Sequence, residues 1–90
     1  MGAYGGPAAV SVEGSDGEVP VTVWAISHVD EGGEQAWVGR LAPRQPGSLL
    51  AAHIARRASL VIGGQTGHIQ ITVYTDELCE FHGLDDPPFL

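Results

Sequence analysis

The stretch that decides the fold is "HIQITVYTDELCEFHG", residues 68–83. Alternate residues of a β-strand point to opposite faces, and one face of its first half is apolar, with Ile69, Ile71 and Val73. The other face carries His68, Gln70, Thr72 and Tyr74. An acidic turn follows, and the pattern predicts a β-hairpin with one buried face. Its polar face is either the solvated outside of a sheet or part of a binding site.

Strand and turn signals extend from this hairpin towards the N-terminus. We expect six strands, which cover residues 8–13, 19–29, 35–42, 59–64, 68–75 and 77–84. Most of them are joined by short turns rich in glycine and acidic residues, such as Asp16-Gly17. The strand over residues 19–29 is apolar on both faces, so we expect it to be central and covered on both sides. Gly39 lies in mid-strand and predicts the close approach of another group, Trp24 or Trp37.

One short helix is expected after the third strand. "PRQPG", residues 43–47, ends the strand pattern, and Ser48 can cap a helix over residues 49–57. Leu50, Ile54 and Ala58 would form the buried stripe of this helix.

These elements predict an all-β, mostly antiparallel domain. Six strands with short links favour a meander that curls into a small barrel or a flattened sandwich. The 90 residues form a single domain in this interpretation. Residues 1–7, with three glycines and a proline, are expected to be a loose lead-in. In the tail, residues 85–90, two prolines interrupt strand pairing, and Phe89 is expected to pack on the end of the barrel.

Charge narrows the classes of partner. Eleven acidic residues stand against four arginines and no lysine, and the net charge is -7. Such a chain repels phosphate backbones, which excludes nucleic acids and anionic membranes as partners. All four arginines lie between residues 40 and 57, a segment without acidic residues. They either form ion pairs across the fold or make an anion-binding patch.

A single cysteine, Cys79, and the absence of a charged leader or long apolar run predict a soluble cytoplasmic protein. A chain this short removes only about 60–65% of its unfolded surface from water. A homodimer would add to the buried area and is therefore an expected assembly.

Neither a metal site nor a cofactor is expected. The four histidines lack the close spacing of metal ligands, and Cys79 and His82 fall on opposite faces of a strand. "GGQTG", residues 63–67, leads into no helix that could hold a phosphate. Cys79 shares a strand face with Phe81, which favours burial in the core over a role as nucleophile.

The strongest chemical candidate is the pair Glu80 and His82. Both fall on one strand face, where the carboxylate could orient the imidazole as a general base. The alternative is that this face is only the solvated outside of the barrel. The residues expected to form a ligand-binding surface are Trp24, His28, Trp37, Arg40, Gln70, Thr72 and Tyr74.

Four segments carry a family resemblance: "YGGPAAV" (4–10), "VPV" (19–21), "SHVDEGGEQAWVGR" (27–40) and "EFHGLDDPPF" (80–89). Across nearly its whole length the chain resembles a family of small bacterial domains of unknown function. These domains occur alone and also fused to the C-terminus of flavin-containing monooxygenases. The resemblance implies an accessory or small-molecule-binding role in the oxidation of small hydrophobic metabolites, with a flavin-dependent monooxygenase or such a metabolite as partner. The alternative is a small stand-alone enzyme, of the cyclase or isomerase type, that uses acid–base residues in a barrel pocket.

Overall fold

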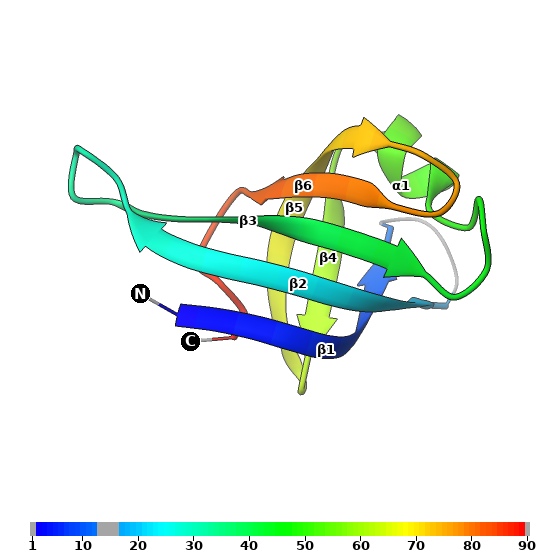
Figure 1. The fold of residues 1–90 in the computed structure, drawn as a ribbon, viewed down its shortest axis with the longest axis horizontal. Coiled ribbons are helices and arrows are strands. Elements are labelled where there is room, and N and C mark those ends of the chain that lie inside the picture. Colours follow the sequence, from blue (N-terminus) through cyan, green and yellow to red (C-terminus); the bar gives the residue numbers. More distant parts are fainter. Residues whose placement is uncertain (1, 13–16, 90) are drawn as a thin grey trace.

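The structure is a computed structural model that describes residues 2–12 and 17–89. Its elements are β1 (Gly2–Ser11), β2 (Val19–Val29), β3 (Gln35–Pro43), α1 (Leu50–Ala55), β4 (Ala58–Ile62), β5 (Gln65–Tyr74) and β6 (Cys79–Gly83). All strand pairs are antiparallel, and the strands close into a barrel (Figure 1). The predicted all-β class, with six strands and one short helix after the third, is confirmed. No helix in the described part of the chain is long and apolar enough to cross a membrane.

The strand order departs from a single meander at one point. Around the barrel the order is β1-β2-β3-β6-β5-β4, so β1–β3 and β4–β6 form two separate meanders. The segment between β3 and β4 contains α1, which packs against β4 and β5. Leu49 and Ala52 of this segment belong to the buried core. The chain therefore crosses one end of the barrel here, so that β3 pairs with β6 instead of β4.

The loose lead-in expected for residues 1–7 is wrong for residues 2–7, which form most of β1. Gly2–Val10 pair with Val19–Ser27 of the long strand β2. Glycine has a weak intrinsic preference for strands, but pairing with a neighbouring strand overrides such preferences. The other end of the expected first strand, at Glu13, and the turn residue Asp16 lie outside the described residues.

The prediction that residues 19–29 are covered on both faces is also wrong. Val21, Val23 and Ala25 are buried inside the barrel. On the outer face, Trp24 is 50% exposed and Ile26 is 55% exposed. The wall of the barrel is one strand layer thick, and α1 packs against β4 and β5 at the barrel end instead of covering β2.

The helix is shorter than expected and buries other residues. Ser48 does not cap it, because its hydroxyl donates a hydrogen bond to the Gln45 carbonyl at 2.7 Å. Leu50 and Ile54 of the predicted buried stripe are 46% and 69% exposed. The helix lies across the barrel end with Leu49 and Ala52 pointing inward. Its buried face is therefore a different one from the predicted stripe.

Two details of β5 differ from the sequence prediction. The turn before it consists of Gly63 and Gly64, both with positive φ, so β5 begins at Gln65 instead of residue 68. A register shift between Ile71 and Val73 then interrupts pairing with β6. Val73 consequently turns outward and is 46% exposed, while Tyr74 packs against the core.

Trp37 organises the end of the barrel opposite α1. Its indole is 1% exposed and meets the rings of Phe81 and Phe89 edge-on, at centroid distances of 5.6 and 5.9 Å. Its Nε1–H donates to the Asp85 carbonyl at 2.5 Å. Phe89 also lies 6.4 Å from the Tyr4 ring, so the C-terminal tail packs across this end.

The close approach of another group, which the mid-strand position of Gly39 predicts, is present in the structure. A Cβ at residue 39 would overlap the Trp24 carbonyl oxygen and lie 2.9 Å from Cζ of Phe81. The approaching groups are thus the backbone of β2 and the Phe81 ring, rather than the Trp24 or Trp37 ring.

Candidate functional site

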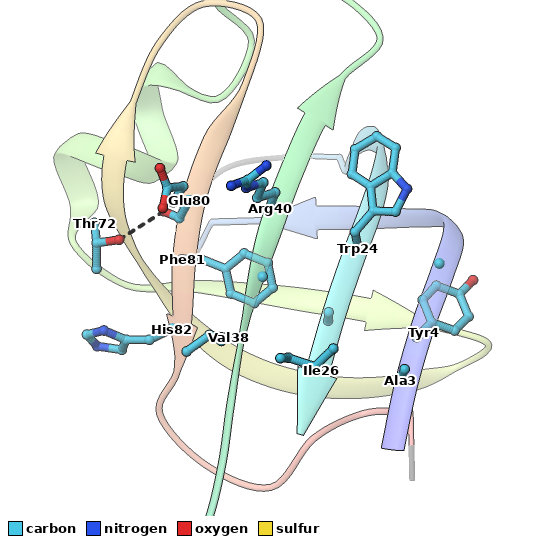
Figure 2. A pocket seen from close by; sticks show the side chains of 13 residues that line it. Ala3, Tyr4, Trp24, Ile26, Val38, Arg40, Thr72, Glu80, Phe81 and His82 are labelled. Carbon is cyan, nitrogen blue, oxygen red and sulfur yellow. Dashed lines mark hydrogen bonds between the residues drawn. The ribbon is translucent and has the colours of Figure 1, made fainter. Parts of the chain in front are cut away.

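A shallow groove of about 820 Å³ lies on the outer face of the barrel, over β1, β2, β3 and β6 (Figure 2). Trp24, Ile26 and Val38 give it an apolar surface. Its polar side chains come from β3, β5 and β6: Arg40, Thr72, Glu80 and His82. Ala3, Tyr4 and Gly5 of β1 form the remaining wall. The groove therefore combines exposed apolar area with a few polar groups, the composition common in ligand sites.

Strand register arranges these side chains in two rows across the sheet. One row joins Trp24 of β2, Arg40 of β3 and Glu80 of β6 as cross-strand neighbours. The next row joins Ile26, Val38 and His82 in the same way. Neighbouring strands are about 4.8 Å apart, so side chains within a row contact one another or a shared ligand.

Small residues on β1 leave the Trp24 ring open. Gly5 is the cross-strand partner of Trp24, and a Cβ at Gly5 would lie 3.6 Å from Cδ1 of the indole. Ala3 is the partner of Ile26 and presents only a methyl group. The Tyr4 ring packs against Phe89 and the core, so β1 has no large side chain on the outer face here. One edge of both apolar residues therefore faces the groove.

The charged side chains of the groove are not tied to one another. Among the described residues, neither hydrogen bonds nor ion pairs link Arg40, Glu80 and His82, although Arg40 and Glu80 are direct partners. Thr72 donates from Oγ1 to the backbone carbonyl of Glu80 at 3.3 Å, which connects β5 to β6 beside the register shift (Figure 2). The guanidinium, carboxylate and imidazole thus remain available to polar groups of a ligand.

The structure brings together five of the nine residues predicted for a site. Trp24, Arg40, Thr72, Glu80 and His82 all line the groove. Gln70 is the cross-strand partner of His82 and extends the second row, but it does not line the groove.

The other three predicted residues lie elsewhere. Trp37 is buried in the core, and His28 lies on β2 beyond Ile26, opposite Ala36 of β3. Tyr74 lies at the α1 end, where its ring stacks on His53 at 5.2 Å and its hydroxyl donates to Asp76 Oδ1 at 3.0 Å. Tyr74 therefore does not converge with Glu80 and His82, because the register shift in β5 turns Tyr74 away from the outer face.

Sequence reasoning missed Ile26 and Val38, which are 55% and 39% exposed in the groove. Ile26 belongs to the apolar outer face of β2, which was expected to be covered. The signal that could have identified it is an apolar row on both faces of a strand in a chain with too few residues for a second layer.

Two titratable groups at the α1 end, Cys79 and Tyr74, have raised pKa values. Burial raises the pKa of the Cys79 thiol, in keeping with its predicted place in the core. Partial burial, together with the hydrogen bond to Asp76 and its charge, raises the pKa of Tyr74. Among residues 2–12 and 17–89, no group of three His, Cys, Asp or Glu side chains is placed to hold a metal ion.

No protein-family model matches the chain, and no curated protein or solved structure matches it either.

Proposed function

We propose that this protein is a binding module without chemistry of its own, whose groove takes up a small hydrophobic molecule. The observation that carries the proposal is the exposed apolar row in the groove, Trp24 and Ile26, next to Val38. Apolar surface left in water costs about 25 cal/mol per Å² relative to buried surface. Contiguous exposed apolar residues with a polar border are typical of ligand and partner sites.

The resemblance to domains fused to flavin-containing monooxygenases extends this proposal. We propose that the chain acts in the cytoplasm as an accessory to flavin-dependent oxidation, and that its ligand is the hydrophobic substrate or product of such an enzyme. Arg40, Glu80 and His82 would then orient a polar group of that ligand, such as a carbonyl or hydroxyl.

A fluorescence titration with medium-chain ketones tests the proposal. Trp24 is half exposed and Trp37 is buried, so a ligand in the groove should change the emission of Trp24 and leave that of Trp37 unchanged. We expect saturation below about 1 mM, a free energy of at least roughly 4 kcal/mol. Ile26→Ser should abolish this change. Ile54→Ser is the matched control, because Ile54 is an exposed isoleucine on α1, and it should leave binding unchanged. A linear, unsaturated response in the wild type would contradict the proposal.

The second candidate is acid–base catalysis in the same groove. It is favoured by the placement of Glu80 and His82, which are two residues apart on β6 and both line the groove. If His82 is a general base, His82→Ala should lower turnover of the true substrate by about 100-fold or more. If the groove only binds, the same variant should change the free energy of unfolding by about 0.5 kcal/mol or less. Isomerisation of a bound ketone or alkene by the wild type, lost in His82→Ala, would favour the enzyme over the binding module.

A further inference from the structure

The outer face of the groove continues along the β2–β3 hairpin to an acidic tip. Because alternate residues share a face, the cross-strand pairs on this face follow one another in a fixed order: Trp24 with Arg40, Ile26 with Val38, His28 with Ala36, and Asp30 with Glu34. The hairpin extends beyond the rest of the barrel (Figure 1). We call this surface, from Trp24 and Arg40 to Asp30 and Glu34, the arm face.

The tip holds its acidic side chains in a defined turn. Asp30 Oδ1 accepts hydrogen bonds from the backbone N–H groups of Gly32 and Glu34, both at 2.9 Å. The backbone N–H of Asp30 donates to the Glu34 carbonyl at 2.8 Å, which continues the ladder of the hairpin. Glu31 and Glu34 are exposed and take no part in these bonds through their carboxylates.

Three of the four arginines lie away from the tip, and the fourth, Arg40, lines the groove. Arg44 follows the end of β3 that is remote from the tip, and Arg56 and Arg57 follow α1. In Figure 1 the tip and α1 lie at opposite ends. The arm face thus changes from the apolar groove, which Arg40 borders, to the anionic tip, about 20 Å away over six residues of strand.

We propose that the arm face docks a basic, amphipathic segment of a partner protein. Its apolar side chains would cover Trp24, Ile26 and Val38, and its lysines or arginines, about 15–20 Å further along, would meet Glu31 and Glu34. This inference rests on the proposed function, because it takes the same apolar groove as its anchor. It adds a second occupant of that groove, which would compete with a small molecule: a face this long with a charged end suits a polypeptide, whereas a small ketone would occupy the groove alone.

A second copy of this chain fits the arm face poorly. Each copy carries a net charge of -7, so two copies repel each other overall. The exposed apolar area is on the order of a few hundred Å². A stable interface of standard size buries roughly 800 Å² per partner. A basic partner supplies the missing electrostatic attraction.

The test uses a fluorescein-labelled peptide, Leu-Thr-Leu-Thr-Lys-Thr-Lys, whose extended length is about that of the arm face. Binding is measured by fluorescence anisotropy with the full chain. The proposal predicts that Trp24→Ala weakens binding about 30-fold, as for a central aromatic anchor. The double variant Glu31→Gln, Glu34→Gln should weaken it about fivefold, and a rise in NaCl from about 50 to 500 mM should weaken it further.

A matched double variant separates the acidic tip from net charge. Glu18→Gln, Glu77→Gln removes the same charge from exposed positions at the start of β2 and in the β5–β6 turn, and should leave the affinity within about twofold of wild type. An equal loss in both double variants, equal binding of a peptide with Glu in place of Lys, or no effect of Trp24→Ala would overturn the inference. Sedimentation as a Trp24-dependent dimer would also overturn it. If ketones still saturate the Trp24 signal in any of these cases, the proposed function stands and only the partner class fails.

Discussion

Gly83→Ala provides a sharp test of how tightly the barrel end is packed. A Cβ at residue 83 would overlap the indole of Trp37, including Nε1. The ring cannot shift easily, since it is 1% exposed and bounded by Phe81 and Phe89. On its other side, even a Cβ at Gly67 would lie only 3.0 Å from Trp37 Cζ2.

The expected cost has two parts. Forcing an extra methyl group into a packed core costs about 1–3 kcal/mol. Displacement of the indole also breaks the hydrogen bond from Trp37 Nε1 to the Asp85 carbonyl, and a buried N–H without a partner costs about 1–3 kcal/mol. We therefore expect Gly83→Ala to lower the free energy of unfolding by about 3 kcal/mol. In a domain of this size, that corresponds to a fall in Tm of roughly 12–24 °C.

Urea and thermal unfolding, followed by circular dichroism, measure this effect. Gly5→Ala is the matched control, because Gly5 is also in a strand and its Cβ would meet only Trp24 Cδ1, at an ordinary 3.6 Å. That control should be neutral or stabilise the protein by about 0.5 kcal/mol through the unfolded state. If the two variants differ by less than about 1 kcal/mol, Trp37 is not held as tightly as this packing requires.

Further predictions concern Asp85, Cys79 and His53. Burial would raise the pKa of Asp85, but its hydrogen bonds to the side chain and backbone N–H of His68, with the charges of His68 and Arg57, lower it overall. Because the pKa of Asp85 is lower in the folded protein than its ordinary value of 3.8, the ionised carboxylate stabilises the fold above that pH. This stabilisation is lost as the pH falls below it. Asp85→Asn should therefore cost about 1 kcal/mol or less at pH 7, since the pair is partly exposed, and the cost should shrink below about pH 4 in urea titrations. Cys79 is fully buried and its pKa is raised, so a thiol reagent should modify it only as fast as the protein unfolds. Rapid labelling of the native protein would contradict the burial of Cys79 in the core. Among the described residues, His53 Nδ1 is buried and has no hydrogen-bond partner. His53→Phe, which keeps the stack on Tyr74, should therefore leave stability unchanged or raise it by about 1 kcal/mol in urea unfolding.

Local sequence signals predicted the strands well where turn chemistry and alternation agree. The acidic turn after β5 and the alternation in β2 placed these elements within a few residues of their positions. The order of strands was not predictable in the same way. It depends on where the segment containing α1 crosses the barrel, and this is decided by the packing of Leu49 and Ala52 against the core.

The candidate site was only partly predictable for the same reason. Cross-strand neighbours such as Glu80 and Arg40 come together through the pairing of β3 with β6, which a single meander does not contain. Tyr74 does not lie on the predicted strand face, because a register shift in β5 reverses its orientation. No residue type in "ITVY" indicates that shift. Trp37 was predicted to lie on the ligand surface, yet its neighbours Gly67 and Gly83 make room for it in the core.

The proposed function places ligands on the outer face around Trp24 and not inside the barrel. Its most direct test is a nitrogen–proton correlation spectrum recorded during titration with a medium-chain ketone. Each of the two tryptophans gives one indole N–H signal, and Trp37→Phe or Trp24→Phe assigns them. We predict a saturable shift of the Trp24 signal while the Trp37 signal, held by Asp85, stays in place. A saturable shift of Trp37 with Trp24 unmoved, or no shift of either signal, would contradict the proposed function.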